Sequence, residues 1–118
     1  MKTWLDKLCE PLGHPQYPQI RGRLIKYEGE EIIGKCAEGE IACQNGIKYD
    51  GYQSILYFEN FISLGVPEDL LYHRFPSIFG TYERECSCLS SYITELNDNG
   101  YTYLEIVEFL RTTFEDAV

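Results

Sequence analysis

Apolar residues recur at intervals of three and four along much of the chain, which is the spacing of one helix face. The strongest repeat lies near the C-terminus and comprises Tyr103, Ile106, Val107, Leu110 and Phe114. Similar spacing predicts helices over residues 55–62 and 89–96, and alanine, glutamate and isoleucine in helical register predict another over residues 36–44. The pattern therefore favours a mainly α fold.

Capping and breaking residues set the expected ends of the earlier helices. Thr3 and Asp6 have the spacing of a capping box, so we expect a first helix after Thr3 that ends at Pro11. Ser54 is the expected cap of the middle helix. Gly39 is unfavourable inside a helix, and we expect it to mark a close approach by another element.

A short β-hairpin is expected near residues 23–33, where two β-competent segments flank Glu28, Gly29 and Glu30. The proline-rich segment 11–19 before it should form an extended connector. A chain of 118 residues has room for one core. We therefore expect a single domain over residues 1–118, with four to five helices and this hairpin.

The stretch LNDNGYTYLEI, at residues 96–106, superficially resembles a calcium-binding EF-hand loop. If Gly100 took the sixth loop position, the twelfth would be Ile106, where the closing glutamate is required. Thr102 and Glu105 instead have the spacing of a capping box. We therefore interpret the stretch as a turn between two helices.

Charge is distributed unevenly along the chain. Residues 1–48 hold seven basic and seven acidic residues, whereas residues 49–118 hold three and twelve, so this acidic helical part carries the whole net charge of −9. Such a surface repels nucleic acid and attracts basic protein surfaces. The plainer alternative is a solvated face that keeps the protein soluble.

Eight of the ten tyrosines also fall in the acidic part. Tyrosine beside carboxylate is common on protein-binding surfaces, although such tyrosines can also line a core with their hydroxyl groups outward. The candidate partner-binding residues are Glu105, Glu108, Glu115, Asp98, Tyr101, Tyr82, Glu83 and Glu85.

Catalytic and cofactor motifs are missing from the sequence. His14 and His73 have no adjacent nucleophile, and the glycines fit neither dinucleotide-binding nor P-loop spacing. We therefore expect a protein that is not an enzyme and has no cofactor. The alternative metal or redox set is Cys36, Cys43, Cys86 and Cys88, although these spacings differ from those of zinc sites and free cysteine is usually a core residue.

The sequence also favours a cytoplasmic protein. No stretch approaches the ~18 apolar residues of a membrane helix, and the N-terminus lacks the features of a signal peptide. An odd number of cysteines, five, favours reduced thiols.

Four segments together resemble a family of short uncharacterised proteins of bacteriophages and bacteria. They are the W-x-x-x-L start at residues 4–8, the connector at 19–24, the Cys-Ala-x-Gly helix at 36–42 and the Leu-Asn-Asp-x-Gly motif within 96–106. Glu38 and Glu40 stand where such sequences usually carry apolar residues. The resemblance implies a phage or mobile-element origin and action inside a bacterial host cell; it carries no activity to transfer.

The resulting hypothesis is an acidic accessory protein that binds a host protein and not nucleic acid directly. One version inhibits a host defence complex such as CRISPR-Cas by presenting a nucleic-acid-like surface to its basic groove. The alternatives are a small cysteine-dependent metal or redox protein and a structural homo-oligomer. The sequence leaves the oligomeric state open.

Overall fold

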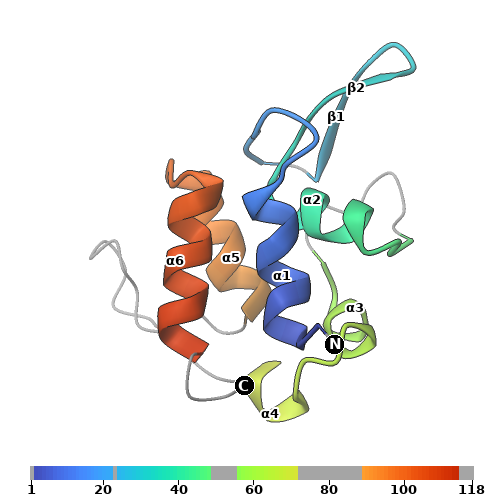
Figure 1. The fold of residues 1–118 in the computed structure, drawn as a ribbon. Helices are drawn as coiled ribbons and strands as arrows, with labels where there is room; N and C mark the ends of the chain where they lie inside the picture. Colours follow the sequence, from blue (N-terminus) through green and yellow to red (C-terminus); the bar gives the residue numbers. More distant parts are fainter. Residues whose placement is uncertain (1, 23, 49–55, 72–88, 115–118) are drawn as a thin grey trace.

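The computed structural model of the chain describes residues 2–22, 24–48, 56–71 and 89–114. Within these residues the elements, drawn in Figure 1, are α1 (Trp4–Gly13), β1 (Ile25–Glu28), β2 (Glu31–Lys35), α2 (Ala37–Gln44), α3 (Phe58–Ser63), α4 (Glu68–Leu71), α5 (Leu89–Asp98) and α6 (Tyr103–Phe114). The fold is mainly α with one small hairpin, as predicted. The described part has six helices because α4 forms a separate short helix after α3.

The first helix begins as predicted but runs further. The side chain of Thr3 accepts a hydrogen bond from the backbone N–H of Asp6, and the Asp6 carboxylate accepts one from the Thr3 N–H. The predicted end at Pro11 is wrong, because α1 continues to Gly13 with the proline in its last turn. Proline has no N–H to donate to the Lys7 carbonyl. The side-chain amide of Asn45 donates to that carbonyl instead, at 2.8 Å.

The hairpin extends away from the helices (Figure 1). The connector, which from here on means the described residues 14–22 between α1 and β1, lies along one edge of the hairpin. Strands β1 and β2 are antiparallel, with Glu28 paired to Glu31 across a two-residue turn in which Gly29 has a φ of 64°. Positive φ at the first turn residue is the geometry that glycine permits. On the outer edge of β2, the Lys35 N–H donates to the Pro18 carbonyl at 2.9 Å.

Helix α2 is short and buried almost all round. A Cβ atom built on Gly39 would lie 2.1 Å from the Leu24 carbonyl oxygen. The predicted close approach at this glycine is therefore confirmed: the backbone before β1 passes directly over α2.

The middle helix starts later than predicted. Helix α3 begins at Phe58, and its cap position is Tyr57. The Tyr57 N–H donates a hydrogen bond to the side-chain oxygen of Asn60 at 2.8 Å. The prediction of Ser54 as the cap is wrong in position, and Ser54 itself lies outside the described residues.

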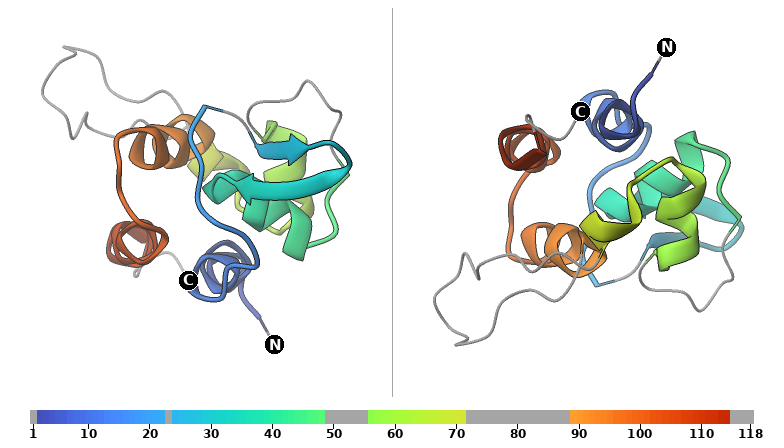
Figure 2. Two further views of the ribbon diagram at one scale, coloured as in Figure 1. Left: turned by 90° about the horizontal axis from the view of Figure 1, so that it is seen from above. Right: turned by 90° about the horizontal axis from the view of Figure 1, so that it is seen from below.

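Helices α1, α5 and α6 run roughly along one direction, and α2 crosses them (Figure 2). Helix α6 lies beside α1, and the Arg111 guanidinium reaches the Asp6 carboxylate at 3.3 Å. The turn between α5 and α6 is confirmed, with Gly100 at a φ of 93°. No helix of the described part is long and apolar enough to cross a membrane.

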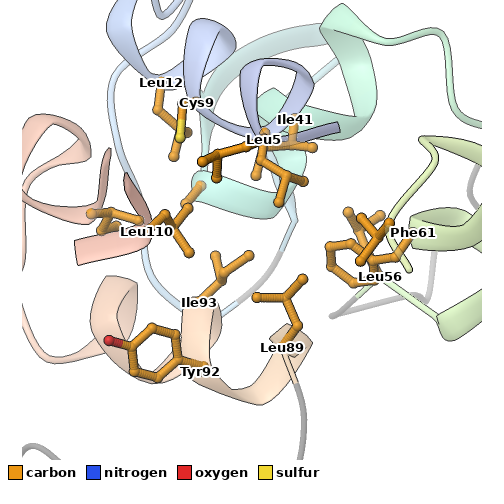
Figure 3. Packing of buried hydrophobic residues seen from close by; sticks show 14 of the residues in the cluster. Leu5, Cys9, Leu12, Ile41, Leu56, Phe61, Leu89, Tyr92, Ile93 and Leu110 are labelled. Atoms are coloured by element: carbon orange, nitrogen blue, oxygen red, sulfur yellow. The ribbon is translucent and has the colours of Figure 1, made fainter. Parts of the chain in front are cut away.

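The core lies between α1, α2, α5 and α6 and extends to α3 and α4 (Figure 3). The apolar faces predicted for the last two helices are confirmed, because their repeating residues point into this core. Its buried members include Leu5, Leu8, Leu12, Ile41, Leu56, Phe61, Leu89, Ile93, Leu96, Ile106 and Leu110.

Candidate functional site

Helix α6 presents one side to the core and the other to solvent. Its buried side comprises Tyr103, Ile106, Leu110 and Phe114. On the opposite side Leu104 is 68% exposed, and Glu105 and Glu108 are also exposed. Residues three and four apart share a helix face. We call the surface formed by Tyr101, Leu104, Glu105, Glu108 and Phe109 the α6 outer face.

Two half-buried aromatic rings form one flank of this face. Tyr101 and Phe109 pack edge to face, with ring centroids 5.2 Å apart and an interplanar angle of 81°. The backbone carbonyl of Tyr101 also accepts a hydrogen bond from the Gln19 side chain at 2.7 Å. The connector and the Phe109 ring therefore hold Tyr101 in place beside the exposed glutamates.

The two exposed glutamates of the face differ in their local roles. The Glu105 carboxylate accepts a hydrogen bond from the Thr102 N–H at 3.0 Å, and the Thr102 hydroxyl accepts one from the Glu105 N–H at 3.2 Å. This reciprocal pair is the predicted capping box. The Glu108 side chain makes no hydrogen bond or ion pair with any described residue. The charge of Glu108 can therefore be changed without disturbing the helix cap.

Asp98, at the end of α5, is exposed but serves the fold. Its carboxylate accepts hydrogen bonds from the Gly22 N–H at 3.1 Å and from the Asn97 side-chain amide at 3.3 Å. These contacts fasten the connector to the corner between α5 and α6. Asp98 therefore contributes negative charge beside the α6 outer face while holding that corner together.

Four of the eight predicted partner-binding residues are described, and all four lie on this corner or on α6: Asp98, Tyr101, Glu105 and Glu108. They lie together because the corner between α5 and α6 carries two of them and one side of α6 carries the other two. The other four lie outside the described residues, namely Tyr82, Glu83, Glu85 and Glu115.

A buried polar cluster around α2 went unrecognised in the sequence. Its members are Lys35, Glu38, Glu40, Ser90 and Asn97, all buried. Charged residues are rarely buried unless they are paired or hydrogen-bonded. The one signal in the sequence was the position of Glu38 and Glu40, in register with apolar residues of a short helix.

Glu38 joins α2 to two other parts of the fold. Its carboxyl group accepts hydrogen bonds from the Thr94 hydroxyl at 2.8 Å, the Ser90 hydroxyl at 2.9 Å and the Leu56 N–H at 3.3 Å. Burial away from water raises the pKa of Glu38 from 4.5 to about 8, although these hydrogen bonds oppose the rise. The group is 1% exposed, so it cannot meet a substrate in this conformation.

Glu40 fastens the connector to the other side of α2. Its carboxylate accepts hydrogen bonds from the Tyr17 N–H at 2.9 Å, the Gln16 N–H at 3.0 Å and the Gln44 side chain at 2.8 Å. Next to it, the buried Lys35 places its ammonium group 4.2 Å from the centre of the Tyr17 ring. A cation over an aromatic face is stabilised by the ring's electron density. This side of the cluster therefore orders the proline-rich connector.

The described cysteines do not come together. Cys36 is buried, and its sulfur accepts a hydrogen bond from the Gly39 N–H at 3.4 Å at the start of α2. Cys43 is exposed in the last turn, about 10 Å further along the axis at 1.5 Å per residue. Burial raises the pKa of the Cys36 thiol to about 12, which disfavours the thiolate that a metal needs.

Cys86 and Cys88 lie outside the described residues. Within the described ranges, no group of three or more histidine, cysteine, aspartate or glutamate side chains could hold a metal ion. The alternative cysteine site remains a prediction that depends on Cys86 and Cys88.

An open hollow of about 390 Å³ lies along α1, beside the C-terminal end of α2. It is lined by Lys2, Lys7, Glu10, Pro11, His14, Gln44 and Asn45. Lys2 is paired with Glu10 at 2.7 Å, and both amide groups are bonded to backbone carbonyls. The lining holds no serine, cysteine or threonine beside His14.

Comparisons of the chain with protein-family models, with curated proteins and with solved structures gave no match in any of the three.

Proposed function

We propose that the chain is a non-enzymatic, acidic accessory protein of a phage or mobile element, and that it binds a host protein in the bacterial cytoplasm through the α6 outer face. The observation that carries the proposal is the exposure of Leu104 beside Glu108 and Glu105 on a helix whose other side is buried in the core. An apolar side chain among acidic ones fits a basic surface with an apolar depression.

The rigidity of this face favours binding. The capping box, the Tyr101 and Phe109 contact and the ion pair of Arg111 with Asp6 all fix α6 before a partner arrives. A surface that is already ordered loses less conformational entropy on association. Tyrosine and phenylalanine are also enriched at protein interfaces.

Charge supports a basic partner. Residues 49–118 carry twelve acidic and three basic residues, so their field accelerates encounter with a positive surface and repels nucleic acid. The specific version that we propose is inhibition of a host defence complex such as CRISPR-Cas, in which the acidic face occupies a groove that otherwise binds phosphate. Binding of this kind weakens as salt rises.

Affinity capture from a bacterial host tests the proposal. Three baits are compared: the wild type, an α6 variant that carries Leu104→Ser with Glu108→Lys, and a control. The control carries Glu59→Lys, an equal charge reversal at an exposed position of α3. We expect the wild type and the control to retain the same partner and the α6 variant to lose it by tenfold or more. Thermal unfolding of all three proteins checks that the fold is kept.

Equal retention by the wild type and the α6 variant would refute the α6 outer face as the binding site. If the Glu59→Lys control lost the partner as completely as the α6 variant, the α6 outer face would also be refuted as the binding site. Net charge alone would then explain capture. Release of labelled guide or target nucleic acid from a purified defence complex tests the specific version. The wild type should release it at low salt and the α6 variant should not.

A further inference from the structure

The outer edge of β1 is open in the described part of the chain. Strand β1 pairs with β2 alone, whereas the other edge of β2 is covered by the connector at Gln19. Lys26, Tyr27 and Glu28 are exposed, with Tyr27 at 54%. The hairpin extends from the helices on a side away from the body of α6 (Figures 1 and 2). An open strand edge is a template for pairing with another strand.

The turn determines which backbone groups this edge offers. Glu28 and Glu31 are paired across the two-residue turn, so the N–H and C=O of Glu28 face β2. Along a strand, successive residues direct these groups to alternate edges. The N–H and C=O of Tyr27, the residue next to Glu28, therefore point outward. Beyond Tyr27 the pairing with β2 shifts register between Lys26 and Tyr27.

We infer that two copies of this chain associate through β1, antiparallel and edge to edge, with Tyr27 opposite Tyr27 of the second copy. In this register the Tyr27 N–H of each copy donates to the Tyr27 carbonyl of the other. Each Lys26 then lies opposite Glu28 of the second copy. The contact would make a four-stranded sheet across a twofold axis, a self-complementary arrangement.

Charge selects this register over its neighbours. A pairing centred on Lys26 would place the two Lys26 side chains opposite each other, and one centred on Glu28 would do the same with two glutamates. Like charges directly opposite destabilise a strand pair, and opposite charges stabilise it. Only the Tyr27-centred register gives two lysine–glutamate pairs and an aromatic pair.

The dimer should be weak. Four residues per strand form a short contact, below the ~1,200 Å² that separates transient from stable complexes. The net charge of −9 on each copy adds repulsion, which ionic strength near about 0.15 M screens over roughly 8 Å. Adjacent lysine–glutamate pairs lie within that distance and are screened less.

Sedimentation equilibrium of the full chain over a concentration series tests the inference. We expect the wild type to associate into dimers as concentration rises, Lys26→Glu to weaken dimerisation tenfold or more, and the exchange Lys26→Glu with Glu28→Lys to restore it to within about threefold. The exchange recreates both opposite-charge pairs with their signs reversed.

Tyr27→Pro provides a second, independent variant. Its missing N–H points outward, and proline is tolerated on that side of an edge strand. It should abolish the dimer while circular dichroism and the unfolding temperature stay close to those of the wild type. A wild type that is monomeric at every concentration would overturn the inference, as would a dimer that none of these variants affects.

Discussion

Glu38 has a chemical environment unlike that of any surface carboxylate of this chain. It is buried, and its hydrogen-bond partners are the Ser90 and Thr94 hydroxyls and the Leu56 N–H. Asp98 adds a small repulsive contribution in the same direction as burial. The raised pKa means that the folded chain keeps a proton on Glu38 at pH values where the unfolded chain has lost it.

Glu38 should therefore make its own contribution to the pH dependence of the protein's stability. The unfolded chain releases the Glu38 proton near pH 4.5 and the folded chain near pH 8, so the favourable contribution is complete below pH 4.5 and is lost as pH rises through about 8. We expect the wild type to lose stability relative to Glu38→Gln on the order of 1 kcal/mol per pH unit over this range. Denaturant unfolding of both proteins between about pH 5 and pH 9 measures the difference. A difference that is constant with pH would contradict a raised pKa.

Gly39 offers a steric test at the neighbouring position. A Cβ atom there would lie 2.1 Å from the Leu24 carbonyl oxygen, a backbone atom that cannot rotate away. Gly39→Ala should destabilise the protein by about 1 to 3 kcal/mol. The matched control is Gly13→Ala at the end of α1, where a Cβ would meet nothing within 4 Å and alanine improves helix propensity. If thermal or denaturant unfolding gave both variants the same stability, the backbone at Leu24 would not approach α2 as closely as described.

At the scale of elements, Asn97 joins three parts of the fold. Its side-chain oxygen accepts hydrogen bonds from the Ala37 N–H at the start of α2 and from Gln19 in the connector. Its amide nitrogen donates to the Ile20 carbonyl at 2.8 Å. The single side chain therefore fixes α2, α5 and the connector relative to one another.

Removing this side chain should be costly. Asn97→Ala leaves the buried Ala37 N–H without its partner, and we expect a loss of about 1 to 3 kcal/mol. Asn99→Ala is the control, because Asn99 is exposed and the one described hydrogen bond of its side chain goes to the Glu95 carbonyl. It should change the free energy of unfolding by less than about 1 kcal/mol. If denaturant unfolding showed the same loss of stability for both variants, Asn97 would not hold these three parts of the fold together.

Elements whose signals are local could be predicted from the sequence. The two capping boxes, at Thr3 with Asp6 and at Thr102 with Glu105, join residues three apart and were correct. The length of α1 could not be predicted, because the group that replaces the missing proline donor comes from Asn45, 38 residues from Lys7.

Local signals also predicted the exposed glutamates but not the buried ones. The exposed positions of Glu105 and Glu108 followed from helix phase alone. The buried positions of Glu38 and Glu40 did not, because their donors come from residues 16–17, 56, 90 and 94. A linear pattern assigns a carboxylate to solvent unless its distant partners are known.

At the scale of the whole molecule, the two proposed surfaces lie on different elements and would work together. Pairing through β1 leaves the α6 outer face of each copy uncovered by that contact. A dimer would then present two acidic faces to a partner with repeated basic sites, and binding at one would raise the effective concentration at the other. The binding proposal does not require the dimer, because a single copy carries the complete face.

Carboxyl footprinting of the complex with the captured host protein tests the central claim most directly. A carbodiimide reagent labels exposed aspartate and glutamate, and mass spectrometry reads the extent at each residue. The account predicts that partner binding protects Glu105 and Glu108 by severalfold and leaves Glu59 labelled as in the free protein. Unchanged labelling of Glu105 and Glu108 in a fully formed complex would contradict it.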